Sequence, residues 1–306
     1  MKTMQAILSW IMVSRWRAAA VTFVTGAVNL LSILGGGLVA LVGLRQGPIE
    51  GLAVCLLAGA GLLALSLAVG VDPLVVVGGA MTLWLPAVLV AWVLTRTRSQ
   101  AHGIQASGAV GGLGVLAFYL GTEAPGERGR EFVDQFLVPM AERMGEGETP
   151  DTEVLDAWAG MVPGLLGAAL MVAVMVSLLL GRWWQAILYN PGGFQAEFHE
   201  LRHGLVPMYV LGGIMVLAAL SGQPWAMNLA LIAIIVLLMQ GLSVIHALVH
   251  RRGLGGFWLV PVYGLLVLLP LPVMTALAGL GIVDNVVDIR ARYAPRPPEQ
   301  DSDSES

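Results

Sequence analysis

The chain has 306 residues, of which 57% are apolar and only 12% are charged, and its mean hydropathy is +0.80. About a quarter of the residues in soluble domains are charged, so this composition excludes a water-soluble globular protein. The formal net charge of −4 combines basic and acidic residues that lie in different segments, and we expect no nucleic-acid partner. The apolar residues form continuous runs, which predicts an all-α fold, a polytopic transmembrane helical bundle whose first partner is the lipid bilayer.

Residues 1–17 are predicted to form an interfacial helix on the cytoplasmic side. Lys2 precedes a short apolar run, and Arg15, Trp16 and Arg17 follow that run. A cleaved secretory signal would have small residues at this point. We therefore interpret the segment as a surface anchor and not as a leader.

Six apolar runs are long enough to cross a hydrocarbon core, which needs roughly 20 helical residues. They fall into N-terminal membrane helices within residues 18–120 and C-terminal membrane helices within residues 158–290. The single cysteine, Cys55, lies in the first run, so no disulfide framework exists and the residue is expected to pack. The runs are residues 51–69, 74–94, 104–120, 161–180, 205–220 and 226–249.

Two further stretches, 18–44 and 258–283, are longer than one crossing needs and are interrupted near the middle. The first contains Asn29 and the glycines 35–37, and the second contains Pro270 and Pro272. If each stretch crosses once, the bundle has eight membrane helices, and basic residues lie on both sides. If each is a tight hairpin, the bundle has ten.

The hairpin alternative places thirteen of the sixteen lysines and arginines, all but Arg128, Arg130 and Arg143, on one side together with both termini. Cytoplasmic loops carry an excess of Lys and Arg, so this distribution favours ten helices with both ends in the cytoplasm. Short hairpin arms are the geometric cost, because about 13 residues rise only roughly 20 Å.

The segment 121–157 is acidic and is predicted to be periplasmic. Apolar residues recur in it at helical spacing, with an interruption at Pro139, and Thr149-Pro150 is a suitable start for the following helix. Either a solvated loop with one amphipathic helix or a substrate lid would have this pattern. Residues 291–306, rich in Pro, Ser and acidic residues, are predicted to be a disordered tail.

The connection 181–204 is predicted to be a cytoplasmic interfacial loop. Aromatic residues typical of the headgroup layer precede a turn at residues 190–193, and a second amphipathic stretch follows it. The segment either anchors the bundle at the surface or docks a cytoplasmic or membrane protein partner. The candidate docking residues are Trp183, Trp184, Tyr189, Asn190, Phe194 and Phe198.

Histidines raise the question of a metal site. His199 and His203 fit the H-E-x-x-H pattern, which on a helix holds zinc, and His246 and His250 have the same spacing. The pattern is permissive and no third ligand is identifiable. We therefore interpret it as a chance match and expect no metal, no cofactor and no enzymatic activity, with a zinc-dependent enzyme as a remote alternative.

Polar residues inside the apolar runs are the ligand-binding candidates, because an unpaired polar group is costly in hydrocarbon. They are Asn29, Gln240, Asn228 and Ser243, and each has the alternative role of an interhelical hydrogen bond. No charged residue is expected at mid-depth, which disfavours an ion-coupled pump.

The segment 181–204, the run 281–290 (GIVDNVVDIR) and the turn 44–48 (LRQGP) resemble the YybS-like family of predicted bacterial membrane proteins, a domain of unknown function. The resemblance extends from about residue 17 to residue 292. It implies an organisation similar to the substrate-binding components of energy-coupling-factor transporters, helical bundles of the bacterial inner membrane that work with separate ATPases and a separate coupling protein.

Two functions are therefore expected. The first is a small-molecule-binding subunit of a transport system, with a pocket that opens outward beneath the acidic segment. The second is a non-enzymatic assembly or scaffold protein that docks a partner through residues 181–204.

Overall fold

A computed structural model describes residues 2–143 and 152–293, in which every regular element is a helix. This confirms the all-α class. Six of the described helices are long and apolar enough to cross a membrane, so the chain is a helical membrane protein. They are α4 Pro48–Val69, α5 Pro73–Thr97, α6 Gln100–Leu120, α9 Thr152–Tyr189, α12 Pro224–Arg251 and α14 Pro270–Val287. The expected count of eight to ten membrane helices is not confirmed, since α11 Leu205–Ser221, both arms of the first interrupted stretch and the first arm of the second are shorter.

The first interrupted stretch forms two packed helices. After the N-terminal helix α1 Lys2–Met12, the chain bends by 114° into α2 Arg15–Gly26, whose start is capped by the Ser14 side chain. The chain then passes through the 3₁₀ turn η1 Asn29–Leu31 into α3 Ser32–Gln46, which packs against α2. The break therefore lies at Asn29, and the three glycines belong to α3. They are needed there because Trp84, Ser177 and Trp184 pack directly on the backbone of α3 at Gly35, Gly36 and Gly37 respectively.

The second interrupted stretch breaks at Pro270, the first of the two prolines near its middle. The short η3 Gly256–Leu259 leads into α13 Val260–Leu268, the backbone leaves the helical region at Leu269, and Pro270 begins α14. Pro270 has no N–H to continue a helix and fits the first turn of the next one. Helix α14 packs closely on α12, because Gly241 and Gly281 leave no side chain between the two backbones.

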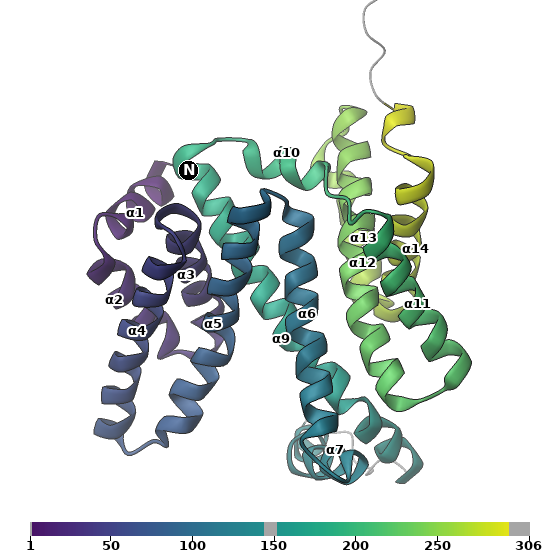
Figure 1. The fold of residues 1–306 in the computed structure, drawn as a ribbon, viewed down its shortest axis with the longest axis horizontal. Helices are drawn as coiled ribbons and strands as arrows, with labels where there is room; N and C mark the ends of the chain where they lie inside the picture. Colours follow the sequence, from purple (N-terminus) through teal and green to yellow (C-terminus); the bar gives the residue numbers. More distant parts are fainter. Residues whose placement is uncertain (1, 144–151, 294–306) are drawn as a thin grey trace, which may run out of the picture.

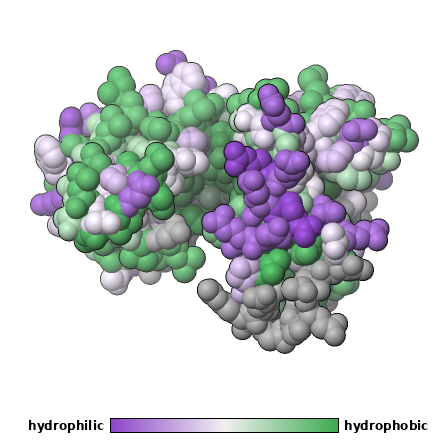
Figure 2. Space-filling view, turned by 90° about the horizontal axis from the view of Figure 1, so that it is seen from below, coloured by the Kyte–Doolittle hydropathy of each residue, from purple (hydrophilic) through white to green (hydrophobic). Residues whose placement is uncertain are grey.

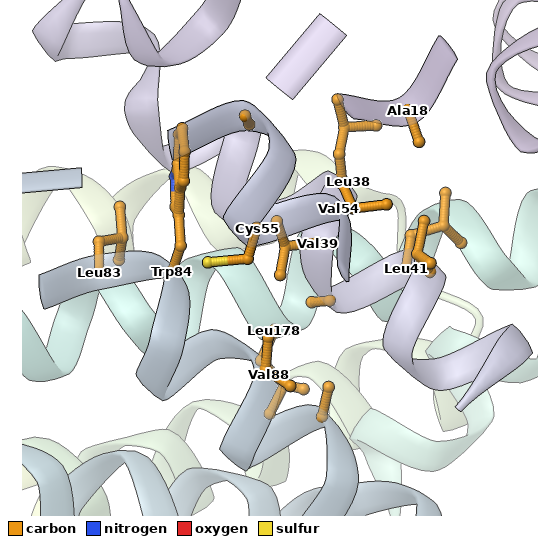
Figure 3. Close-up of a cluster of buried hydrophobic side chains, with 14 of the residues drawn as sticks. Ala18, Leu38, Val39, Leu41, Val54, Cys55, Leu83, Trp84, Val88 and Leu178 are labelled. Atoms are coloured by element: carbon orange, nitrogen blue, oxygen red, sulfur yellow. The ribbon is translucent and has the colours of Figure 1, made fainter. Parts of the chain in front are cut away.

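The two largest apolar clusters of the core share α9. The N-terminal cluster is formed by side chains of the first five helices and of one face of α9, and Figure 3 shows part of it. Within it, Cys55 is fully buried beside Met81, and the buried Trp84 ring donates a hydrogen bond of 3.1 Å to the carbonyl of Ser32. The C-terminal cluster joins α6, the other face of α9, α12 and α14. Helix α9 thus holds the two halves of the bundle together.

The ends of the bundle differ in character. Helix α1, helix α10 Gly193–His199 and the C-terminal end of α14 lie at one end, and α7 Pro125–Phe132 lies at the other (Figure 1). Figure 2, viewed from the α7 end, shows hydrophilic residues gathered on one side and a mainly apolar lobe beside them. The termini of the described chain share the α10 end.

The acidic segment forms α7, the π-helical turn η2 Val133–Leu137 and α8 Val138–Arg143. The expected interruption at Pro139 is therefore displaced: Pro139 is the second residue of α8, and the wider turn precedes it. A proline cannot donate to the carbonyl one turn earlier, which explains the irregular turn. Thr149 and Pro150, and the tail after residue 293, lie outside the described residues.

Candidate functional site

The predicted interfacial loop 181–204 is only partly a loop. Helix α9 continues through residues 181–189, the chain turns at Asn190 and Gly192 (φ +83°), and α10 follows. Residues 200–204 then lead without helix into α11. The prediction was wrong for the first nine residues, because buried contacts of Arg182 and Trp184 with neighbouring helices extend α9 beyond its apolar run.

The aromatic candidates mostly face the bundle. Trp184 packs against Gly37, and the Arg45 guanidinium lies 4.2 Å from the centre of the Tyr189 ring. Phe194 and Phe198 are half-buried with their rings stacked, and Phe198 also packs edge-on against His246 of α12, at 5.4 Å between ring centres. Among the aromatic residues of this segment, Trp183 is 39% exposed and Tyr189 is 46% exposed.

The first polar contact of this segment ties α10 to α9 and α6. The Arg182 side chain is only 9% exposed, and its Nε donates to the Glu197 carboxylate at 2.9 Å while a second nitrogen also contacts it. Gln100, at the start of α6, donates to the same carboxylate at 3.2 Å. Three separate segments are thereby held at one carboxylate.

A buried network of hydrogen bonds around Gln240 of α12 is the second polar feature of this region. The Gln240 carbonyl oxygen accepts from the backbone N–H of His203 at 2.9 Å and from Asn285 at 3.0 Å. Its amide nitrogen donates to the Asp284 carboxylate at 3.2 Å. Gln240 is fully buried, and both its amide oxygen and its amide nitrogen are hydrogen-bonded, so it joins residues 200–204 and α14 to α12.

Arg290 completes this network. It donates to the Asp284 carboxylate at 2.6 Å, to the backbone carbonyls of His199 and Leu201 at 2.6 and 3.0 Å, and to the Ser243 hydroxyl at 3.3 Å. Asp284 lies in the last turn of α14 and Arg290 follows that helix, so this buried pair is at the α10 end of the bundle and leaves the expectation about mid-depth untested. Both members of the Asp284–Arg290 pair are buried, and their attraction at low dielectric, together with these hydrogen bonds, reduces the cost of burial. Asp284 Oδ1 and Arg290 Nε have no hydrogen-bond partner among the described residues.

The spacing of this pair in the sequence does not predict their contact. Asp284 and Arg290 are six residues apart, which does not place them on one helical face. Asp288, at φ +50°, ends α14 in the left-handed conformation and turns the chain back so that Arg290 reaches Asp284. Arg202 contacts Asp288 and holds the pKa of that carboxyl below its usual range.

His203 is held as a neutral imidazole. Its Nε2 lies 2.8 Å from the carbonyl of Val236, which can only accept, so Nε2 carries the proton. Its Nδ1 accepts from the amide nitrogen of Gln105 at 3.2 Å, and the same nitrogen donates to the His203 carbonyl at 3.1 Å. Burial first, and the nearby His102 to a smaller extent, lower the pKa of His203 to about 4.

The H-E-x-x-H residues do not share a helical face. Helix α10 ends at His199, whose ring faces His250 at 5.0 Å between centres, whereas His203 is engaged with α6 and α12. His246 contacts Phe198 and Tyr263. Across the described residues, no three His, Cys, Asp or Glu side chains are placed to hold a metal ion.

The other ligand-binding candidates are Asn228, Ser243 and Asn29. Asn228 donates to the Tyr119 hydroxyl at 2.8 Å and to the Gly160 carbonyl at 2.9 Å, which joins α12 to α6 and α9. Ser243 donates to the Phe198 carbonyl at 2.6 Å. Both are interhelical links in the structure, and Asn29 is the first residue of η1.

A groove lies beside the buried network. Helices α6 and α11 both pack against α12, and residues of all three helices line the groove. The cavity has a volume of about 370 Å³, and Gln105, with its amide nitrogen bound to His203, is the polar residue of its wall. The other lining residues are Gly108, Ala109, Gly112, Val206, Pro207, Val210, Leu211, Ile214, Leu229, Ile232, Ala233 and Val236.

Comparison of the chain with protein-family models, with curated proteins and with solved structures finds no match. The fold and the site define the class by themselves: a helical membrane protein with a buried polar network at one end and an apolar groove beside it.

Proposed function

We propose that the protein is a multi-pass protein of a bacterial inner membrane that binds a single-chain amphiphilic molecule, as the substrate-binding subunit of a transport system. One observation carries this function: the groove between α6, α11 and α12, apolar along its length and polar at Gln105. Its volume of about 370 Å³ lies within the range of about 300–1,000 Å³ typical of small-molecule sites.

We expect a ligand with an apolar chain, because the walls of the groove are formed by helices that lie in the membrane. A ligand that enters from lipid gains little from the hydrophobic effect, since lipid tails are equally apolar. Close packing against three helices and one fixed polar contact are therefore what favour a particular molecule.

The polar residue of the groove, Gln105, favours a ligand that carries a hydrogen-bond donor. The Gln105 amide nitrogen donates to both Nδ1 and the backbone carbonyl of His203, so its two hydrogens are committed. The carbonyl oxygen of Gln105 is the remaining group, and it can only accept. The ligand class is thus an alkyl or isoprenoid chain that ends in a hydroxyl or amino group.

A labelling experiment tests this function. Protein in lipid nanodiscs is exposed to a photoreactive straight-chain alcohol, with and without an excess of unlabelled long-chain alcohol. Wild-type protein should show saturable labelling of α6 or α11. Ala109→Phe, which fills the groove, should abolish it, and Ala60→Phe on the exposed face of α4 is the matched control. Labelling that is unsaturable, or equal in the two variants, would refute a ligand site in the groove.

The same topology supports an orientation with the α10 end in the cytoplasm. Arg15, Arg45 and Arg98 belong to segments that approach this end, and Arg130 at the other end pairs with Asp134 and Asp156. Short cytoplasmic loops are those enriched in basic residues.

A scaffold role is the second candidate, and we propose a contact surface for it other than the aromatic residues. Phe194 and Phe198 are used inside the bundle, so a partner of α10 would meet Gln195, Ala196 and Glu200, which are exposed. Ala196→Arg should then release a co-purified partner without changing the melting temperature. Release of an ATPase pair would instead agree with the transport function.

A further inference from the structure

A second cavity lies at the α10 end, and no residue of its wall belongs to the groove. It has a volume of about 270 Å³ and is formed by α3, α5, α9 and α10. The lining residues are Leu44, Leu94, Thr95, Arg98, Arg182, Gln185 and Glu197. Five of these seven side chains are polar or charged, which sets this cavity apart from the groove.

The charges of this cavity do not cancel. Arg182 is neutralised by Glu197 through two contacts, and Gln100 donates to the same carboxylate. Arg98 makes no ion pair or side-chain hydrogen bond with any described residue. The wall therefore carries one positive charge in excess, so an anion would compensate it.

The unused donors converge on the same space. Arg182 binds Glu197 through Nε and Nη2, which leaves the two hydrogens of Nη1 free, and Arg98 keeps all five of its N–H donors. The remaining amide and hydroxyl are less available, because Gln185 donates to the Leu44 carbonyl and Thr95 to the Ala91 carbonyl. Two arginines from different helices are thus the groups left to bind a ligand.

The backbone at Arg98 adds a second observation. Arg98 ends α5 in the left-handed conformation, with φ +54°. Such a position favours glycine or asparagine, and a long side chain is uncommon there. A guanidinium at this strained position fits a residue retained for its side chain.

We propose that this cavity binds a phosphate group between Arg98 and Arg182. Guanidinium forks match the oxygens of phosphate, and donors from two helices reach different oxygens of one tetrahedral group. The phosphate belongs either to an anionic lipid headgroup, because the cavity lies at the end where arginines meet the membrane surface, or to a soluble phosphate ester.

The experiment measures binding of two probes to the full-length protein. Inorganic phosphate is titrated in detergent, and retention of phosphatidylglycerol is followed by native mass spectrometry. Wild-type protein should bind at least one probe: phosphate binding identifies a soluble source, and retention of phosphatidylglycerol alone identifies a lipid source. Arg98→Gln should weaken the binding by about tenfold or more, since a hydrogen bond to a charged group contributes about 1.5–3 kcal/mol.

Two further variants separate a site from general attraction. Arg96→Gln is the matched control, because Arg96 lies over the Trp92 ring and is not part of the cavity wall. Glu197→Gln should strengthen binding, because it removes the negative charge that neutralises Arg182. Equal losses in Arg98→Gln and Arg96→Gln, weaker binding in a folded Glu197→Gln variant, or binding of neither probe by the wild type would overturn the proposal.

Discussion

Acidification should destabilise the folded protein through His203. In the folded state burial lowers the pKa of this imidazole from 6.5 to about 4. In the unfolded state the pKa returns to its ordinary value near 6.5. Between these two values the unfolded chain binds a proton that the folded chain does not, so stability is lost as the pH falls.

The size of the effect follows from the width of this pH window. Each unit of pKa difference corresponds to about 1.36 kcal/mol. From pH 6.5 to pH 5 the window spans about 1.5 units, which gives a loss of about 2 kcal/mol, and the loss reaches about 3 kcal/mol near pH 4. The structural cause is local: a proton on Nδ1 would face the amide hydrogens of Gln105 and would lie near His102.

The assay is chemical unfolding in detergent at about pH 7 and about pH 5. His199 also has its pKa lowered to about 4, by burial and then by neighbouring charges, so both proteins carry His199→Gln. Against that background, His203→Gln keeps a donor for the Val236 carbonyl and has no titrating group. The protein with His203 should lose about 2 kcal/mol more than the variant between the two pH values. An equal pH dependence in the two proteins would refute the reasoning.

Three further outcomes are expected. Asp284→Asn leaves Arg290 buried without its counter-ion and should cost about 3–5 kcal/mol; adding Arg290→Met should recover part of this in the same unfolding assay, and a double variant no more stable than the single one would contradict it. Phe198→Ala should cost about 1–3 kcal/mol because the ring packs inside the bundle, and should leave co-purified partners unchanged; lost partners at unchanged stability would show that the ring docks them. A cysteine at Glu127 should react with an impermeant maleimide from the periplasm and one at Gln195 should not, whereas labelling of both would reject the proposed orientation.

Much of the secondary structure could be predicted from the sequence because the backbone hydrogen bonds of a membrane helix are local. In hydrocarbon each backbone group must bond within its own segment, so runs such as 74–94 and 226–249 predict α5 and α12 nearly to their ends. The interruption at Pro270 was predicted for the same reason, since a proline removes a donor wherever it stands. The length of α9 was not, because its last turns depend on contacts with α3 and α10.

The candidate site was the harder part. Gln240 and Ser243 were identified as polar residues in apolar runs, but Gln105, Asp284 and Arg290 were not identified as site residues. The partners of these residues are distant in the chain: 98 residues separate Gln105 from His203, and 44 separate Gln240 from Asp284. Periodicity and composition carry no information about such pairs.

The sequence by itself therefore determined that the protein belongs in a membrane, where most of its long helices lie and that two stretches are interrupted, because hydropathy and proline act over a few residues. Tertiary structure alone decided that His199 and His203 separate, that Asp284 and Arg290 are buried together, and that α6, α11 and α12 enclose a groove. The physical reason is that a buried charge or an apolar cavity depends on which helices pack against each other, and that choice is made by close contacts of the whole bundle.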